Sequence, residues 1–240
     1  MILHIPHSSI HLPKIFTINE AVSLKQEFQR MTDWYTDELF DFDTAEKSVF
    51  PYSRLYCDVE RYRDDNAEPM AQKGMGVCYE RTSFGTELRV ISEEVKVLIK
   101  SNIYDVHHHT FEKMVQEELE QKGSVLIVDC HSFSDEVLPH EESSVRPDIC
   151  IGTDSYHTPI ALTELICGFF EDEGLVVSIN EPFRGTIVPL KYLNTNENVK
   201  SVMIEINRKL YLDDDFSKSE NFDRMKERIQ AVLKVISEKI

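Results

Sequence analysis

One stretch of the sequence places reactive side chains directly after an apolar run. The run spans Val125 to Val128, and Asp129, His131 and Ser132 follow it at once. A continuous apolar run of this kind is typical of a strand buried on both faces, as in a parallel sheet. Ligands of open α/β sheets bind beyond the carboxyl ends of the strands, so His131 is placed where a metal ligand or a catalytic base is useful. The alternative is a histidine that only hydrogen-bonds a neighbouring loop.

Two further apolar runs also end in reactive side chains. Ile2 to Ile5 predicts a short strand, and His7 follows it. Val199 to Ile206 predicts another strand, with Glu205 and Arg208 at its end. Because carboxyl ends of parallel strands meet at one edge of a sheet, we expect these groups to lie close together. For His7 the alternative is a loop histidine without a ligand.

The segment from Pro51 to Asp65 is dense in charged residues. Alternation of apolar residues from Leu55 to Val59 predicts an edge or half-buried strand, and Asp58 and Arg61 lie beside it. An arginine held beside acidic residues can grip a carboxylate through two parallel hydrogen bonds. The alternative is a solvated network of salt bridges, which is common on acidic proteins.

Helical stretches supply further candidates. Asn19 to Met31 has helical spacing with Asn19 as its cap, and Thr32-Asp33 then begins a second helix, so Asp33 is either a cap or a metal ligand. Ser92 to Gln121 predicts a long helix, capped by Ser92, that contains His107-His108-His109. Successive side chains on a helix turn by about 100°, so at most two of these histidines can face the sheet.

The groups at the predicted strand ends include histidines, carboxylates and arginines. Two histidines and a carboxylate, with a fourth position open to water, make a catalytic zinc site. A further glutamate could act as general base on that water, and arginines could polarise a carbonyl or bind a substrate carboxylate. This is the chemistry of amide hydrolysis. Spacing alone does not select the metal, and the sequence contains no HExxH motif.

Strands and helices alternate along the chain. Short strands are predicted at Asp148 to Gly152 and at Leu175 to Ile179, with a helix from Thr158 to Asp172 between them. Ser219 to Ile240 carries apolar residues at helical spacing, so this helix packs one face on the sheet. The sequence therefore predicts a single α/β domain over residues 1–240, with a mixed, mostly parallel sheet flanked by helices.

The composition argues against several classes of partner. A formal net charge of −17, from 26 basic and 43 acidic residues, disfavours nucleic acid and anionic membranes, which need a basic face. An acidic small molecule is not excluded, because a local arginine cluster can dominate one pocket. No apolar run approaches the roughly 20 residues that span a bilayer, and no signal peptide is evident. Five scattered cysteines without a Cys-x-x-Cys pair indicate reduced thiols, so we expect a cytoplasmic protein.

Several short motifs along nearly the whole chain match those of a known family. They are Pro6-His7-Ser8-Ser9, Thr32-Asp33, Ser53-Arg54-Leu55, Asp58-Val59-Glu60-Arg61, Asp129-Cys130-His131-Ser132, Asn180 through Gly185, and Glu205-Ile206-Asn207-Arg208. The chain thereby resembles the N-formylglutamate amidohydrolases, which are similar in fold to zinc carboxypeptidases and succinylglutamate desuccinylases. The last motif is the most specific, whereas the Asp-x-His-Ser motif is shared more widely with the carboxypeptidases. The resemblance implies a phosphorylase/hydrolase-like fold of the zinc carboxypeptidase type.

The resemblance also implies ligands for zinc. His7 and His131 match two histidine ligands. In the carboxypeptidases a glutamate ligand follows the first histidine by three residues, but Ile10 holds that position here. The third ligand is then expected elsewhere, with Asp33 as first choice and Asp58 as second.

Catalytic and substrate-binding roles follow from the same resemblance. Glu205 matches the strand-end glutamate that serves as general base, and Arg61 matches the arginine expected to stabilise the oxyanion or hold the substrate. Four further residues are candidates for substrate contacts: His108, Arg184, Arg208 and Asp58. Glu60 stands where the family usually has asparagine, and an acidic side chain there disfavours a dianionic substrate.

Three functions are compatible with these expectations. The first is a zinc-dependent amidohydrolase that uses metal-activated water to cleave an N-formyl or short N-acyl amino acid, an acidic small molecule similar to N-formylglutamate. The second is a metallo-carboxypeptidase acting on a peptide or cell-wall fragment. The third is a non-catalytic small-molecule binder with the same fold. Metal content separates the binder from the two enzymes, and a screen of N-acyl amino acids against short peptides separates the enzymes.

Overall fold

A six-stranded sheet runs through the part of the chain that the computed structural model describes, which is residues 1–139, 141 and 143–239. Its strand order is β2-β1-β3-β6-β4-β5. The strands are β1 (Ile2–Ile5), β2 (Glu46–Val49), β3 (Val125–Phe133), β4 (Ile149–Gly152), β5 (Val177–Ile179) and β6 (Val199–Asn207). Neighbouring strands pair in parallel, except that β4 pairs antiparallel with β6. The prediction of a mixed, mostly parallel sheet is confirmed.

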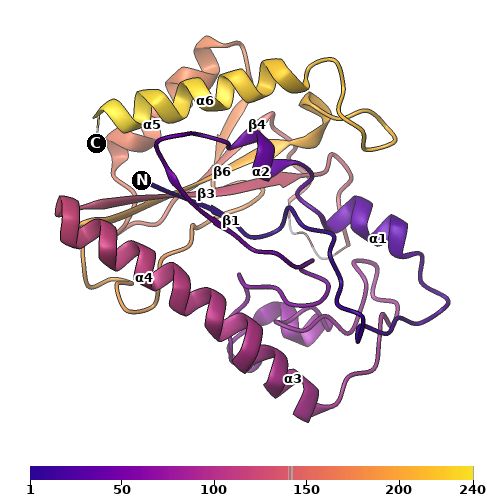
Figure 1. Cartoon of the computed structure of the whole chain (residues 1–240). Helices are drawn as coiled ribbons and strands as arrows, with labels where there is room; N and C mark the ends of the chain where they lie inside the picture. Colours follow the sequence, from indigo (N-terminus) through magenta and orange to yellow (C-terminus); the bar gives the residue numbers. More distant parts are fainter. Residues whose placement is uncertain (140, 142, 240) are drawn as a thin grey trace.

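Helices cover both faces of this sheet (Figure 1). The α-helices are α1 (Leu24–Met31), α2 (Thr36–Leu39), α3 (Glu93–Ile99), α4 (Asp105–Lys122), α5 (Ile160–Asp172) and α6 (Phe222–Lys239). Short 3₁₀ turns lie at Pro69–Lys73 and Arg208–Leu210, and a π-helical turn joins α3 to α4 at Lys100–Tyr104. Helices α5 and α6 lie on one face of the sheet and α4 lies on the other. No helix of the described residues is long and apolar enough to cross a membrane.

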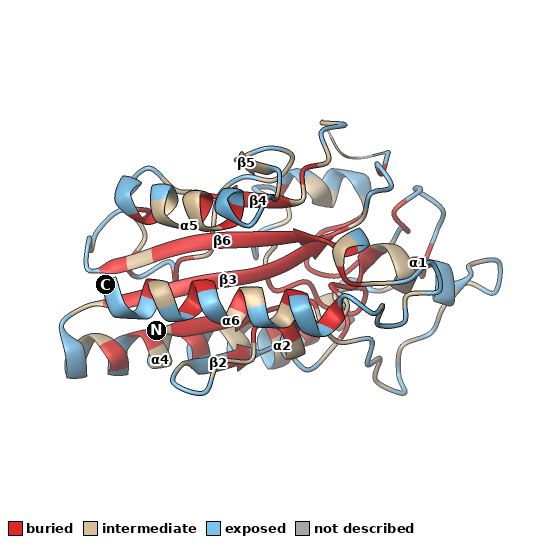
Figure 2. Ribbon diagram, turned by 90° about the horizontal axis from the view of Figure 1, so that it is seen from above, coloured by how far each residue is buried: buried red, intermediate tan, exposed pale blue. Residues whose placement is uncertain are grey.

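The two central strands, β3 and β6, are apolar on both faces because helices cover both sides of the sheet. Leu126 and Val128 pack toward α5 and α6, whereas Val125 and Ile127 pack toward Phe111 of α4. Successive strand residues point to opposite faces, so a strand covered by helices on both sides needs an unbroken apolar run. Figure 2 shows β3 and β6 buried along most of their length.

The face of the sheet that packs on α4 changes from apolar to polar along the strands. Near the amino ends it carries Ile127 and Val199, which pack with α4. The next positions on this face of β3 are Asp129 and His131, and Glu205 of β6 lies beside His131 in the parallel register. Each of these three polar residues is at most 7% exposed. The polar part of this face lies at the carboxyl ends of the strands, where α/β sheets bind their ligands.

Strand boundaries differ from the sequence prediction at two places. Strand β3 does not end at its apolar run but continues to Phe133, because β6 pairs with it over its whole length. His131 is therefore held by a strand ladder rather than by a loop. Strand β2 has no counterpart in the prediction, because its edge position leaves most of its polar sequence exposed. The other four strands are confirmed to within a few residues at their ends.

The helices before the site begin later than predicted. Ser23, not Asn19, caps α1, and its hydroxyl accepts a hydrogen bond from the backbone N–H of Gln26 at 3.4 Å. Asp33 caps no helix, because α2 begins only at Thr36. Its carboxylate is therefore available for other contacts.

The predicted strand from Leu55 to Val59 is wrong. This backbone forms turns, and the N–H of Asp58 bonds to the carbonyl of Val77 at 2.8 Å. The apolar side chains are buried nonetheless, with Cys57 in one cluster with Ile99 of α3. The alternation thus reflects packing against a helix and its neighbouring turns, and not pairing in a sheet.

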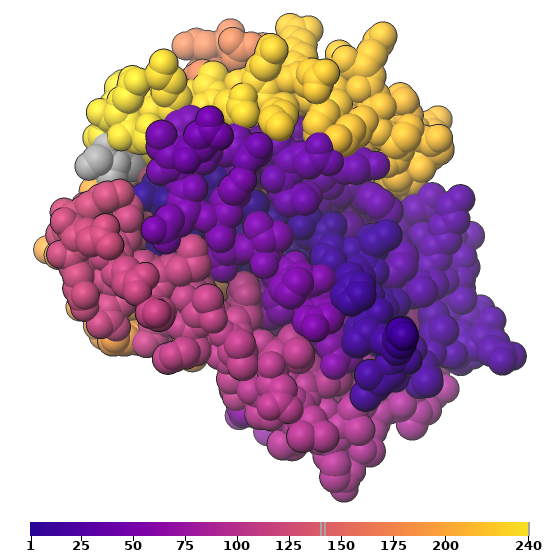
Figure 3. Space-filling view, in the orientation of Figure 1, coloured from indigo at the N-terminus to yellow at the C-terminus, as the bar shows by residue number. Residues whose placement is uncertain are grey.

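The two long helical predictions are confirmed in part. Ser92 caps α3 as predicted, but the stretch to Gln121 is divided by the π-helical turn. Helix α6 begins at Phe222, and Ile240, the last residue of the predicted helix, lies outside the described residues. Figure 3 shows N-terminal segments, in indigo and purple, on the surface between the magenta α4 and the yellow α6.

Gly152 ends β4 where the fold leaves no room for a side chain. An added Cβ would overlap the carbonyl oxygen of Gly185 and the side chain of Met203. We expect Gly152→Ala to lower the free energy of unfolding by about 1–3 kcal/mol, as overpacking does. Urea denaturation measures this change.

Gly168 on α5 provides the control, because nothing lies within 4 Å of its added Cβ. Gly168→Ala should raise the free energy of unfolding by about 0.5–1 kcal/mol, since alanine favours a helix. Equal stabilities of the two variants would contradict the close approach at Gly152.

Candidate active site

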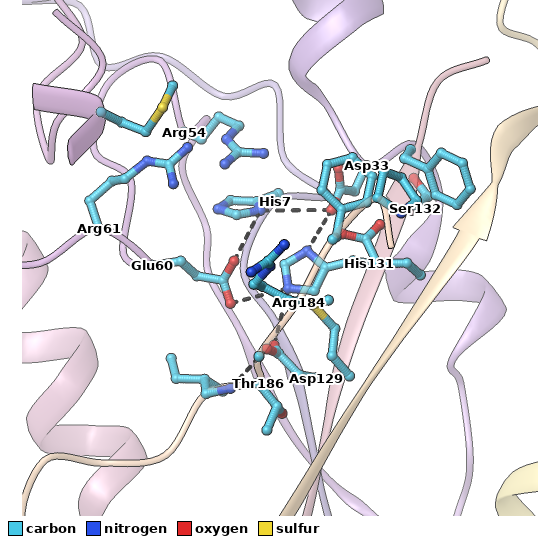
Figure 4. Close-up of a pocket in the computed structure, with 18 of the residues that line it drawn as sticks. His7, Asp33, Arg54, Glu60, Arg61, Asp129, His131, Ser132, Arg184 and Thr186 are labelled. Atoms are coloured by element: carbon cyan, nitrogen blue, oxygen red, sulfur yellow. Dashed lines mark hydrogen bonds and ion pairs between the residues drawn. The ribbon is translucent and has the colours of Figure 1, made fainter. Parts of the chain in front are cut away.

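A cavity of about 980 Å³ lies at the carboxyl ends of β1, β3 and β6. His7 reaches it just beyond β1, His131 from β3 and Glu205 from β6. Glu60 and Arg184 reach it from two separate loops (Figure 4). The structure therefore brings together the two strand-end histidines and the strand-end glutamate that the sequence predicts to be close.

His7, Glu60 and His131 converge on one point in this cavity. Each offers a ligand atom within 4.8 Å of the others. Oε1 of Glu60 lies 3.1 Å from Nε2 of His131, and Oε2 lies 3.7 Å from Nδ1 of His7. Nδ1 of His7 is buried and has no hydrogen-bond partner among the described residues. Two imidazole nitrogens and one carboxylate oxygen fit a catalytic zinc site, and the unpartnered nitrogen is suited to a metal ion.

A second carboxylate holds each histidine by its other ring nitrogen. Nε2 of His7 lies 2.9 Å from Oδ1 of Asp58, and Nδ1 of His131 lies 2.9 Å from Oδ2 of Asp33. Such partners fix the tautomer and the orientation of histidines in metal sites. Burial disfavours charge on Asp33, but the hydrogen bond from His131 and the nearby ring of His7 hold its pKa below the usual range. The predicted ligand Asp33 therefore lies on the side of His131 away from Glu60.

His131 lies among three carboxylates. Besides Asp33 and Glu60, Oδ1 of Asp129 is 3.1 Å from its Nε2. Burial alone would lower the pKa of His131, but the charges of Glu60 and Asp129 and its hydrogen bonds raise that pKa well above the usual range. The surroundings of this ring thus favour a positive charge, which a proton or a metal ion can supply.

Asp129 connects three parts of the chain. Its Oδ1 also lies 2.9 Å from Nδ1 of His4 on β1, and its Oδ2 accepts a hydrogen bond from the backbone N–H of Ile187 at 3.1 Å. Nε2 of His4 in turn lies 3.1 Å from Nε2 of His107 on α4. His4, Glu60 and Asp129 form a second group within 4.8 Å. Asp129 thereby fixes the loop at Ile187 relative to the sheet.

Asp58 is fully buried behind His7. Its Oδ2 accepts hydrogen bonds from Nε and Nη2 of Arg54, at 3.1 and 2.8 Å, and from the hydroxyl of Tyr79 at 2.8 Å. Burial would raise the pKa of Asp58, but the charges of Arg54 and His7 hold it well below the usual range. Protein groups thus surround the carboxylate of Asp58, and its contact with the substrate stays a prediction.

Two arginines present guanidinium groups to the cavity. Nη2 of Arg61 lies 3.5 Å from the hydroxyl of Tyr79, and its buried Nε has no hydrogen-bond partner among the described residues. Arg184 is exposed, lines the cavity, and makes no hydrogen bond or ion pair with any residue that the structure describes. The Nε of Arg61 lies 3.5 Å from Oδ2 of Asp58, so the donors left for a substrate are those of Arg184 and the terminal nitrogens of Arg61.

Arg208 lines the cavity, but its donors are engaged by the protein. Nη1 donates to the backbone carbonyls of Gln29 and Arg30, at 3.1 and 2.9 Å. Nε and Nη2 donate to the hydroxyl and the carbonyl of Ser132, at 3.2 and 3.1 Å. Arg208 thus fastens the end of α1 to β3, and its role in substrate contact stays a prediction.

The three consecutive histidines of α4 point in different directions. His107 and His108 are half-buried and His109 is exposed, as the helical rotation predicts. Nε2 of His108 donates to the carbonyl of Val59 at 2.8 Å. His108 thus binds the backbone of the turn before Glu60, and its contact with the substrate stays a prediction.

Glu205 is 7% exposed and lies beside His131 in the ladder of β3 and β6. Burial raises the pKa of Glu205 to about 8. Its Oε2 has no hydrogen-bond partner within the described part of the chain. A carboxyl group with these properties can take up and release a proton near neutral pH.

Glu60 is the residue of this site that the sequence does not identify as a ligand. It lies in a turn, and its partners are at positions 7 and 131. No local pattern of helix or strand points its side chain at those histidines. The one feature of the sequence that could have identified Glu60 is its place in the motif that contains Asp58 and Arg61. There it replaces the family's usual asparagine.

The buried network around Asp58 predicts a large effect of removing its charge. We expect Asp58→Asn to lower the free energy of unfolding by about 3–5 kcal/mol, because Arg54 would keep a buried charge without its partner. Denaturation in urea measures the loss. Asp105→Asn is the control, because Asp105 pairs with Arg63 at 2.7 Å on the exposed surface. That change should cost less than about 1 kcal/mol, and an equal loss in both variants would refute the buried network.

Comparison with known proteins gives the relatives of this fold. The crystal structure of N-formylglutamate amidohydrolase from Ralstonia eutropha superposes with a TM-score of 0.83 at 18% identity, covering 99% of this chain and 92% of that chain. A crystal structure of a gene product from Agrobacterium tumefaciens superposes with a TM-score of 0.64 at 17% identity, covering 98% of this chain and 91% of that one. No curated protein sequence matches the chain.

The sequence itself also matches a family model. The model of the N-formylglutamate amidohydrolases covers residues 1–212, which include every residue of the site described above. The resemblance that the short motifs indicate is thus confirmed. The chain belongs to the N-formylglutamate amidohydrolase family.

Proposed function

We propose that this chain is a zinc-dependent amidohydrolase that cleaves the amide bond of an N-formyl or short N-acyl amino acid. The observation that carries the proposal is the convergence of His7, Glu60 and His131 on one point of the cavity. Membership of the amidohydrolase family supports the reaction class. A zinc ion at this point would acidify a water molecule and polarise the carbonyl of the amide.

Glu60 fits the role of third ligand better than Asp33, the first choice from the sequence. Its two oxygens reach both rings, since Oε1 lies 3.1 Å from Nε2 of His131 and Oε2 lies 3.7 Å from Nδ1 of His7. Oδ2 of Asp33 is also 3.7 Å from that nitrogen of His7. Asp33 instead bonds Nδ1 of His131, where it orients the ring. As a ligand Glu60 would not act as a free negative charge, so its presence is compatible with an acidic substrate.

Glu205 is the proton carrier in this proposal. A general base works best when its pKa lies near the working pH, and burial raises the pKa of Glu205 to about 8. The side chain is next to His131 in the ladder and has a free oxygen within the described structure. We assign to it the uptake of a proton from the attacking water and its transfer to the leaving amine.

Arg61 and Arg184 are the proposed substrate contacts. A guanidinium binds a carboxylate through two parallel hydrogen bonds, and Arg184 has all its donors available among the described residues. Arg61 lies on the opposite loop beside Glu60 and is suited to the carbonyl oxygen, where negative charge develops during the reaction. An acidic N-acyl amino acid satisfies both cations.

A second candidate substrate follows from the size of the cavity. Its volume of about 980 Å³ leaves room beside a small N-formyl amino acid. A metallo-carboxypeptidase acting on a peptide or cell-wall fragment would use the same groups. For the partners, the net charge of −17 supports a small molecule over nucleic acid or membrane, and the five free thiols support the cytoplasm.

Removal of a ligand tests the metal site. We expect the purified protein to bind about one zinc ion per chain, and His131→Ala and Glu60→Gln to lose it. Elemental analysis after dialysis measures the stoichiometry. His109→Ala is the control, because this exposed histidine lies on the same helix as His108 but faces solvent. If Asp33→Asn weakens zinc binding more than Glu60→Gln does, Asp33 is the ligand and Glu60 is not.

Replacement of Glu205 separates catalysis from metal binding. Glu205→Gln keeps the shape but removes the proton acceptor, so zinc and substrate should still bind while turnover falls about 100-fold or more. The assay measures acid released from N-formyl and short N-acyl amino acids, with short peptides in parallel. Turnover of peptides alone would favour the carboxypeptidase, and no turnover of either would refute the proposed reaction. Near-normal turnover in Glu205→Gln would remove this residue from the mechanism.

A further inference from the structure

The turn that carries Glu60 is fastened to the helical segment of α3 and α4 on both sides of this residue. Val59 accepts a hydrogen bond at its carbonyl from Nε2 of His108 at 2.8 Å. The carbonyl of Arg61 accepts one from the hydroxyl of Tyr104 at 2.7 Å. The backbone on either side of Glu60 therefore faces the helix, whereas its carboxylate faces the two histidines (Figure 4).

Tyr104 and His108 form one rigid surface on the helix. They are four residues apart, and their ring centroids are 4.2 Å apart. Burial lowers the pKa of His108, which favours the neutral ring that donates from Nε2. Tyr104 is also held by packing, because it lies in the same buried cluster as Val59.

The π-helical turn at Lys100–Tyr104 lets Tyr104 face the same side as the buried residues of α3. Ile99 and Tyr104 are five residues apart, yet both are buried in one apolar cluster with Cys57. An α-helix places residues three or four apart on one face, and a π turn absorbs one extra residue. Single π turns of this kind occur often at functional sites.

Glu60 has little else to hold it. Its backbone N–H donates to Oδ1 of Asp58 at 3.1 Å, and it belongs to neither a helix nor a strand. Among the described residues, the partners of its carboxylate are His4, His7 and His131. The direction of the side chain thus depends on the backbone from Val59 to Arg61, which these two hydrogen bonds hold at its ends.

We propose that Tyr104 and His108 are positioning residues that aim the Glu60 carboxylate at His7 and His131. This inference rests on the proposed function, in which Glu60 is a metal ligand. Neither residue lines the cavity, and each acts through one backbone carbonyl of the turn. Partners that orient metal ligands typically change metal affinity by about 10–100-fold when they are removed.

The experiment measures the dissociation constant of zinc by competition with a chelator, and the melting temperature of the metal-free protein, for the same variants. Tyr104→Phe removes one hydroxyl and His108→Ala one ring donor. We expect each to weaken zinc binding about 10-fold or more. His108→Gln keeps an N–H donor near the position of Nε2 and should restore most of the affinity.

His157→Ala is the matched control. His157 is 1% exposed, and its Nδ1 lies 2.7 Å from the carbonyl of Val199 at the amino end of β6. The control loses this bond and a second one, in which Nε2 accepts from the backbone N–H of Asn194 at 2.9 Å, but neither touches the turn of Glu60. It should therefore lower the melting temperature while zinc affinity stays within about twofold, well short of the loss expected for a positioning partner.

The outcomes separate the two proposals. Absence of zinc binding in the unmodified protein refutes the proposed metal site itself. If the unmodified protein binds zinc and both Tyr104→Phe and His108→Ala keep its affinity, the positioning role is refuted while the metal site stands. The inference would also be overturned if zinc affinity fell in proportion to melting temperature in all three variants, His157→Ala included. That result would show a general effect of stability.

Discussion

The burial of aspartates around two histidines is the constraint on which the rest of this structure depends. Asp33, Asp58 and Asp129 are each at most 2% exposed. A buried carboxylate is stable only when hydrogen-bond donors and positive charge surround it. His7 and His131 provide these from other segments, and Arg54 provides them from the segment of Asp58 itself. The outcome is a set of fixed negative charges that favours a cation between the two rings.

The two faces of the sheet differ because of this constraint. The face under α5 and α6 is apolar along the strands, since both helices pack on it. On the other face apolar contacts with α4 end at Ile127, and the carboxylates begin with Asp129. Beyond that point loops replace the helix, and they supply Glu60 and Arg184 from opposite parts of the chain. The same strands thus support a hydrophobic core and a polar cavity.

The sequence predicts the parts of the site that follow from local patterns. His7, His131 and Glu205 each adjoin an apolar run, and strand geometry alone brings such positions to one edge of a parallel sheet. Glu60 and Asp33 could not be assigned in this way, because their contacts with His131 join residues 71 and 98 positions apart. Similarly, the alternation from Leu55 to Val59 predicts a strand, but packing against α3 produces the same burial without one.

The separation of these partners along the chain also bears on how the site forms. His7 and Asp58 are 51 positions apart, and Asp33 and His131 are 98 apart. Closing such long loops costs conformational entropy before any contact is gained. A partly folded chain can expose both histidines, but it lacks the aspartates that set their tautomers. The cluster of histidines and carboxylates is therefore complete only when all these segments have docked.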